Sequence, residues 1–253
     1  MKKLLISLFS LFLFGQLFAQ NYKPFPTSNA VWNEVHYDTH NGVCQHSSTY
    51  IKTDTIINGK TYHKFETTKY ISLLNNNNCG IGYNYYVVNN GYFRNDSINQ
   101  KIWYINPSLN VFSDTLLFDF NLQVGDTLPE LFFTFDYYNY YIDSIDYINY
   151  GGVLRKRLFI KDFFQQGSLP QTFLIEGVGS NRGLFQNLGL SLCCYSDLNC
   201  FSENSQTVFP DSTSACQIAT SINKRHNLVD AEIIVFPNPV KNKLSIQGLA
   251  SEQ

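Results

Sequence analysis

The chain has 253 residues, of which 15% are charged and 16% aromatic, and its formal net charge at pH 7 is −2. A balance this close to neutral, without a cluster of basic residues, excludes nucleic acid and anionic membrane surfaces as favoured partners. The chain contains 17 tyrosines and 21 phenylalanines and is also rich in asparagine. These residue types favour strands joined by turns. The composition therefore predicts a β protein that is long enough to bury a sizeable core.

The N-terminal residues have the pattern of a secretory signal peptide. Lys2 and Lys3 precede an apolar run over residues 4–18, and Ala19 is the small residue after which a signal peptidase would cut, leaving Gln20 first. The run is shorter than the roughly 20 residues that a membrane-spanning helix needs. We therefore predict that residues 1–19 are a cleaved signal peptide and that no integral membrane segment remains after its removal.

The six cysteines of an exported chain indicate disulfides. Proximity in the sequence favours one bridge between Cys44 and Cys79 and two bridges among the remaining four cysteines, and the pairing of those four stays open. The alternative is a metal site, because three of the four are clustered. Their spacing matches no standard zinc motif, and no histidine lies nearby, so we favour disulfides. The four are Cys193, Cys194, Cys200 and Cys216.

Short strand-like segments separated by turn signals extend from residue 31 to residue 208. Three signals predict hairpins because their residues tolerate positive φ: Asn58-Gly59, Asn89-Asn90-Gly91 and Gly151-Gly152. The third joins segments over 140–150 and 153–160. Outside the signal peptide, helical periodicity is nearly absent. The predicted fold class is all-β, with an antiparallel sandwich or barrel-like body of many short strands.

The C-terminal part of the sequence differs in character from this body. We predict an all-β body over 20–211 and a linker over 212–230, which is rich in Ser, Thr and Asn. Two further strands are predicted over 232–236 and 243–246. The segment between them begins with Pro237-Asn238-Pro239, a rigid turn because both prolines fix φ.

The residues of this tail resemble a known family. The run IVFPNPV at 234–240, followed by KLSI at 243–246, resembles the opening of the C-terminal sorting domain of type IX secretion cargo from Bacteroidetes-type bacteria. In that family, a small C-terminal β-sandwich directs the protein across the outer membrane and is then commonly removed. The motif here comprises Phe236, Pro237, Asn238 and Pro239. Because the family's domains continue through later strands, we expect residues 231–253 to form an incomplete sorting domain.

Three segments of the body resemble uncharacterised cargo of the same secretion system. They are TDTIINGKTY at 53–62, LFDFNLQVGDT at 117–127 and IEGVGS at 175–180. The resemblance implies a delivery route and a body plan without an established activity. It implies the type IX export machinery as a partner, engaged through the C-terminal tail, and a location in the medium or on the outer-membrane surface.

Three carboxylates are candidates for an acid and base pair: Asp119, Asp126 and Glu176. A glycoside hydrolase needs two carboxyls roughly 5–10 Å apart across a sugar. However, Asp119 lies between two phenylalanines, and Asp126 follows Gly125 where a turn is expected. An aspartate in a turn more often accepts a backbone N–H than transfers a proton. We therefore expect structural roles and predict no catalytic residue.

The segment over 176–183 contains three glycines whose spacing differs from that of a dinucleotide-binding loop, and no helix follows. We predict a tight turn or bulge there, with Glu176 either paired with Arg182 or bound to the backbone. We expect no cofactor.

Three histidines close together in the sequence are the best candidates for metal ligands. They are His36, His40 and His46, and Asp38 and Cys44 lie among them. Spacings of four and six residues on a strand or loop do not place three side chains on one face. We therefore expect surface polar residues and predict no metal.

A tyrosine-rich run could offer a stacking surface to a carbohydrate or a protein, because tyrosine combines a large apolar ring with a polar tip. Ordinary cross-strand packing is the alternative. As a function, we favour a secreted or cell-surface, non-enzymatic binding or surface-interaction module. The alternative is a secreted hydrolase that acts on polysaccharide through paired carboxylates. The tyrosines are Tyr137, Tyr138, Tyr140, Tyr141 and Tyr147.

Overall fold

The described part of the chain contains only strands as regular elements, which confirms the predicted all-β class. The chain divides into two compact units, residues 1–218 and residues 219–253. No helix within the described ranges is long and apolar enough to cross a membrane. The structure, a computed structural model, describes residues 22–75, 78–79, 83–107, 113–131, 140–162, 171–186, 188, 194–210, 216, 234–236 and 245–247.

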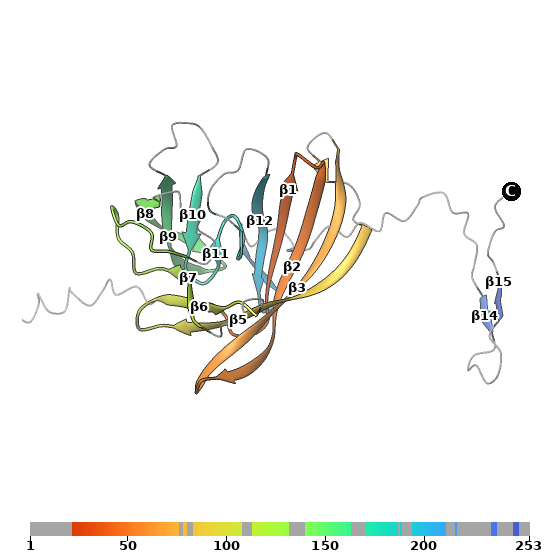
Figure 1. Cartoon of the computed structure of the whole chain (residues 1–253), viewed down its shortest axis with the longest axis horizontal. Coiled ribbons are helices and arrows are strands. Elements are labelled where there is room, and N and C mark those ends of the chain that lie inside the picture. The colour runs from red at the N-terminus through yellow and green to blue at the C-terminus, as the bar shows by residue number, and fades with distance from the viewer. Residues whose placement is uncertain are drawn as a thin grey trace, which may run out of the picture. The chain divides into compact units, whose positions relative to one another are not determined.

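The first unit contains a large antiparallel sheet with the strand order β13-β12-β1-β2-β3-β5-β6-β7, and β4 pairs with β3 outside this path (Figure 1). β2 and β3 are long and bend along their length. The bend has a local cause, since the register of β2 against β3 shifts between Ile51 and Asp54, which marks a β-bulge. The strands are β1 (Ala30–Asp38), β2 (Val43–Ile57), β3 (Lys60–Asn75), β4 (Asn78–Cys79), β5 (Tyr83–Asp96), β6 (Lys101–Ile105), β7 (Thr115–Asp119), β12 (Cys194–Glu203) and β13 (Gln206–Phe209).

A smaller antiparallel sheet has the order β11-β10-β9-β8. Its strands are β8 (Tyr140–Tyr150), β9 (Val153–Asp162), β10 (Thr172–Ile175) and β11 (Gly179–Ser180). The two sheets share one hydrophobic core, in which Trp32 from β1, Phe118 from β7 and Leu158 from β9 are fully buried. Trp32 Nε1 donates to the carbonyl oxygen of Val178 at 2.7 Å and so joins the large sheet to the turn after β10. The body is a sandwich, and its large sheet is open, with β13 and β7 as edges in the described residues.

Two of the three predicted hairpins are present. Asn58 and Gly59 join β2 to β3 with φ values of 50° and 75°. Gly151 and Gly152 join β8 to β9 with φ values of 60° and 77°. Positive φ at both central residues is what a two-residue hairpin turn of type I′ requires.

The hairpin predicted at Asn89-Asn90-Gly91 is wrong, because β5 runs through these residues without turning back. Gly91 pairs with Phe65 and Asn89 pairs with Glu66, so Asn90 is an extra residue that bulges out of the strand. The φ of Gly91 is 97°. A side chain at Gly91 would overlap the carbonyl oxygen of Ile105 on the neighbouring strand β6. The Asn-Gly signal here marks a bulge with a close backbone approach, as it does elsewhere when a glycine lies inside a strand.

Two disulfides lie in the first unit. Cys44 on β2 is bonded to Cys79 on β4, the bridge that proximity in the sequence favours. Cys200 on β12 is bonded to Cys216, so one of the two bridges expected among the last four cysteines is present. Cys193 lies outside the described residues, and its pairing stays a prediction.

The segment before β1 belongs to the body. Phe25 is buried among Trp32, Phe93, Phe118 and other core rings. The side chain of Asn95 fixes it from both sides, because Asn95 Oδ1 accepts from the N–H of Phe25 at 3.1 Å and Asn95 Nδ2 donates to the carbonyl of Phe25 at 3.0 Å. Residues 22–29 therefore form part of the folded body.

In the second unit, β14 (Ile234–Phe236) pairs with β15 (Ser245–Gln247) in antiparallel register. These strands lie where the sequence predicts two strands on either side of the proline turn. The residues of the turn itself, Pro237, Asn238 and Pro239, lie outside the described residues, as do the predicted signal peptide and its cleavage site at Ala19 and Gln20.

Candidate ligand-binding site

The core-facing side of the large sheet extends beyond the small sheet and forms a pocket of about 460 Å³, which we call the β1–β5 pocket. Side chains alternate along β1, so Trp32 in the core, Glu34 and His36 lie on the same face. No strand of the small sheet contributes a described lining residue. The lining residues are Glu34, His36, Gln45, Ser47, Thr49, Thr67, Lys69, Val88, Asn89, Asn90, Tyr104, Asn106, Phe185 and Gln186.

The strand register arranges these side chains in rows across the sheet. Glu34 pairs with Ser47, Ser47 with Lys69 and Lys69 with Tyr86, which makes one row over four strands. Trp32, Thr49, Thr67 and Val88 form the neighbouring row toward the core. Directly opposite side chains in a sheet lie about 5 Å apart. A single small ligand in the pocket can therefore reach groups from several strands at once.

The floor of the pocket is polar and largely satisfied within the protein. The hydroxyl oxygens of Thr49 and Thr67 lie 2.7 Å apart, and the side-chain amide of Asn90 donates to the Thr67 hydroxyl. Both threonines are almost fully buried. In the part of the chain that the structure describes, the hydroxyl of Ser47 has no hydrogen-bonding partner. Ser47 therefore offers one donor and acceptor group to a ligand.

Glu34 is the buried acid of the pocket, with only 3% of its surface exposed. Its Oε1 accepts from the backbone N–H of Leu184 at 2.8 Å, and the side chain of Gln186 also hydrogen-bonds to it. Burial raises the pKa of Glu34 to about 7, an effect that these hydrogen bonds and the charge of Lys69 only partly oppose. A Cβ at Gly183 would lie 2.7 Å from the Glu34 carboxyl, so the glycine makes room for the acid.

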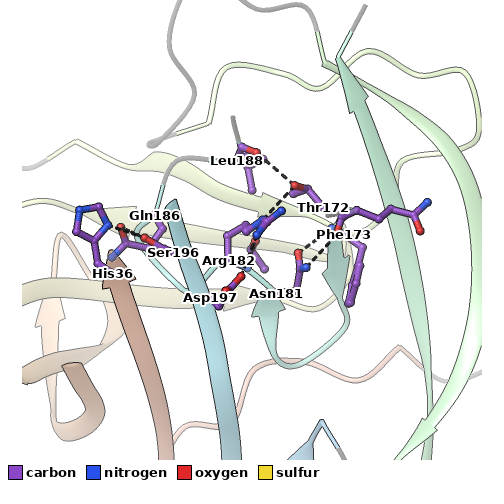
Figure 2. A network of polar contacts seen from close by, with 11 residues as sticks. His36, Thr172, Phe173, Asn181, Arg182, Gln186, Leu188, Ser196 and Asp197 are labelled. Atoms are coloured by element: carbon purple, nitrogen blue, oxygen red, sulfur yellow. Dashed lines mark hydrogen bonds and ion pairs between the residues drawn. The ribbon is translucent and has the colours of Figure 1, made fainter. Parts of the chain in front are cut away.

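A chain of polar side chains connects His36 to the loop after β11 (Figure 2). His36 Nδ1 lies 2.8 Å from Ser196 Oγ, and Ser196 Oγ donates to Gln186 Oε1 at 3.1 Å. Burial lowers the pKa of His36 below its usual value, although Asp38 opposes the shift. The imidazole is therefore mainly neutral at pH 7, and its contacts hold Gln186 at the pocket wall.

The loop that supplies this wall is rigidly attached to both sheets. Buried Arg182 donates through Nη1 to Asp197 Oδ1 at 2.9 Å and through Nε to Thr172 Oγ1 at 3.3 Å (Figure 2). Asn181 accepts from the N–H of Phe173 at 2.9 Å and donates to the carbonyl of Gln171 at 3.0 Å. These contacts fix the loop that carries Phe185 and Gln186 to both sheets.

Two aromatic rings close one side of the pocket. The rings of Tyr104 and Phe185 have centroids 5.3 Å apart, and Phe185 packs edge-on against Phe65 in the core. The hydroxyl of Tyr104 donates to the carbonyl of Asn90. Tyr104 is buried and Phe185 is half-buried, so the Phe185 ring and the polar floor together give the pocket both a stacking and a hydrogen-bonding surface.

The candidate carboxylates lie elsewhere, around one buried lysine. Lys156 Nζ donates to the carbonyls of Phe120 and Leu122, each at 2.9 Å, and burial lowers its pKa against the opposing charges of Glu176, Asp119 and Asp126. The structure thus brings these three carboxylates near a common ammonium group. None of the three lines the β1–β5 pocket.

Each of these carboxylates also has a local structural partner. Asp119 accepts from the N–H of Asn121 at 2.9 Å and lies 3.2 Å from Lys101 Nζ, and Asp126 accepts from the N–H of Gln123 at 2.8 Å. Glu176 accepts from the N–H of Lys156 at 3.3 Å, so it binds backbone and is not paired with Arg182. Burial raises the pKa of Glu176. These contacts are those of turn and anchoring residues.

The three histidines do not converge. Gln45 and Ser47 line the pocket with His36, so His46 points to the opposite face of the sheet. His40 lies exposed in the turn between β1 and β2. Among the described residues, no group of three or more His, Cys, Asp or Glu side chains is placed to hold a metal ion.

The tyrosine-rich run is divided between core and surface. Tyr140 is buried in the core at 4% exposure, whereas Tyr147 is 54% exposed and Tyr141 half-buried. Tyr137 and Tyr138 lie outside the described residues. The described tyrosines do not form one exposed face, so a Tyr-rich ligand surface stays a prediction.

A second hollow, of about 520 Å³, lies beside the N-terminal segment and is lined by residues 23–28 together with Thr61, His63, Asn95, Ser97, Glu203 and Asn204. Lys23 Nζ lies 3.4 Å from Glu203 Oε1 and Glu203 Oε2 lies 3.6 Å from Arg155 Nη2, so its charged groups are already paired. The β1–β5 pocket is the better candidate site because it retains polar groups without partners among the described residues.

Sequence reasoning missed the β1–β5 pocket, although a signal was present. Residues 45–49 are Gln-His-Ser-Ser-Thr, so β2 is polar on both faces although it lies in the interior of a sheet. A strand that packs only on a hydrophobic core alternates between apolar and polar residues. The absence of that alternation at 45–49 indicates that the core-facing side is wet there.

Comparison with protein-family models, with curated proteins and with solved structures finds no match to this chain.

Proposed function

We propose that this chain is an exported, non-enzymatic binding module and that its ligand occupies the β1–β5 pocket. The observation that carries the proposal is a pocket in which two lining residues, Ser47 and Lys69, have polar groups without partners in the described part of the chain, beside the half-buried ring of Phe185. The alternative of a polysaccharide hydrolase has less support, since the candidate carboxylates Asp119, Asp126 and Glu176 bind backbone groups and surround a buried lysine.

Binding and hydrolysis can be separated in one experiment. We expect the purified full chain to retain members of a panel of neutral and acidic oligosaccharides, measured by frontal affinity chromatography, without releasing reducing ends during the run. Release of new reducing ends would favour the hydrolase. Retention of no saccharide in the panel would contradict the binding proposal.

The export route is the second part of the proposal, and the sequence resemblance of the tail supports it. We expect a chain whose residues 231–253 are continued by the remaining strands of a known sorting domain to reach the surface or medium of a host with a type IX system. A chain ending at residue 230 should remain in the periplasm. Cell fractionation measures both, and N-terminal sequencing of the exported form should give Gln20 first. Equal export of the two chains would show that the tail is not a sorting signal.

A further inference from the structure

We propose that the ligand of the β1–β5 pocket is an acidic saccharide and that the ammonium group of Lys69 binds its carboxylate. This inference rests on the proposed function and adds the chemical class of the ligand. The inference has three grounds. The charge of Lys69 has no direct partner among the described residues, Ser47 and Gln45 are neutral polar groups beside it, and Phe185 supplies an aromatic surface.

Lys69 supplies the charge. It lies in the row that contains Glu34, Ser47 and Tyr86, and it lines the pocket. Within the described ranges, its ammonium group makes neither a hydrogen bond nor an ion pair, and its charge acts on Glu34 and His36 only at longer range. Lys69 is half-buried, and an ammonium group in a pocket without a counterion favours an anionic ligand group.

The neighbours of Lys69 limit the anion to a single charge. Glu34 is in the same row, and its carboxyl group already accepts from Leu184 and Gln186. A doubly charged phosphate in this row would face one cation and a nearby carboxyl group, with no arginine among the described lining residues. Planar arginine groups are the usual partners of phosphate, whereas one lysine suits one carboxylate.

The remaining groups match a sugar ring. Ser47 and Gln45 present a hydroxyl and an amide, which can both donate to and accept from sugar hydroxyls. The half-buried ring of Phe185, supported from behind by buried Tyr104, offers a face on which the C–H face of a sugar can pack. The volume of about 460 Å³ is within the range of small-molecule sites, about 300–1,000 Å³. A uronic acid residue, terminal or within an oligosaccharide, combines these features.

The test compares an oligogalacturonide with the same oligosaccharide after methyl esterification, which removes the charge and keeps the ring. Titration calorimetry on the full chain should show binding of the acid and an affinity for the ester lower by about tenfold or more. Lys69→Gln should weaken binding of the acid by a similar factor and weaken binding of the ester less, so that the difference in affinity between acid and ester largely disappears. Lys64→Gln is the matched control because Lys64 lies on the same strand but does not line the pocket, and it should bind as the wild type does.

Each possible result either supports or overturns the acidic-saccharide assignment. Equal affinity for acid and ester, or tighter binding of inorganic phosphate than of the uronide, overturns the acidic-saccharide assignment. In the first case, the pocket still binds saccharides and the proposed function stands. If neither of these two saccharides binds but other members of the oligosaccharide panel do, the acidic-saccharide assignment is wrong and the proposed binding function stands. The comparison of acid with ester uses only wild-type protein and therefore holds even if Lys69→Gln fails to fold, which a thermal melt would detect.

Discussion

Replacing Gly91 with alanine should destabilise the body by about 3 kcal/mol or more. The glycine has a φ of 97°, and a Cβ there would overlap the carbonyl oxygen of Ile105 and lie 2.9 Å from side-chain atoms of Pro107 and Tyr104. The backbone of β6 would have to move away from β5, which would break the pairing of Tyr92 with Ile105. Chemical denaturation followed by tryptophan fluorescence gives the free energy of unfolding.

Gly59→Ala is the matched control. Gly59 also has positive φ, at 75°, but a Cβ there meets nothing within 4 Å. Replacing Gly59 should therefore lower the free energy of unfolding by about 1 kcal/mol, which is the cost of holding an alanine at positive φ. If both variants lose the same amount of stability, the close approach of β5 and β6 at Gly91 is not what selects the glycine.

Replacing Glu34 with glutamine should remove a pH dependence of stability. The pKa of Glu34 in the folded protein is raised to about 7, so the folded state holds its proton more tightly than the unfolded state does. Below the ordinary glutamate pKa, the proton on Glu34 makes its full contribution to the free energy of unfolding. This contribution is lost as the pH rises through 7, and the loss is about 3 kcal/mol in total. Glutamine stays neutral and can still accept from the N–H of Leu184, so the variant should be more stable than wild type at pH 8 by about 2 kcal/mol.

The measurement is the difference in unfolding free energy between variant and wild type from pH 4.5 to pH 8.5, without ligand. Glu66→Gln is the control, because its effect on stability should have the opposite sign. A hydrogen bond from Tyr50 lowers the pKa of Glu66, so replacing this carboxylate should lower the free energy of unfolding at neutral pH. A difference between Glu34→Gln and wild type that does not change with pH would mean that Glu34 is ionised in the folded protein throughout this range.

The two Asn-Gly signals show what local sequence can and cannot predict. Asn58-Gly59 and Asn90-Gly91 have the same turn chemistry, yet the first reverses the chain and the second forms a bulge inside β5. The difference arises from distant partners, since Phe65 on β3 and Ile105 on β6 hold the backbone on both sides of Gly91. Local chemistry predicted positive φ, which occurs at Asn58, Gly59 and Gly91 but is not recorded at Asn90, and tertiary pairing determined whether the chain turns or bulges.

The site was less predictable than the fold for a related reason. Alternation and turn residues are local, and they predicted an all-β body correctly. The pocket depends on register, which places Glu34, Ser47 and Lys69 from three strands side by side. It also depends on Arg182, which fixes the pocket wall through Asp197 on β12. No short motif contains these residues, because they are brought together only when the sheet is complete.

The position of β1 between β12 and β2 has a consequence for the time at which the body can fold. Ala30 pairs with Glu203 and Asp38 with Cys194, so the strand that is made first is completed by one that is made nearly last. Contacts between such distant residues form slowly, because a long loop must close before they contribute. Until β12 arrives, one edge of β1 and one side of Trp32 remain open. The strands from β1 to β7 pair with neighbours in the sequence and can form early, but the large sheet is completed around Trp32 only when residues 194–203 are available. The core of the body is therefore completed late in synthesis.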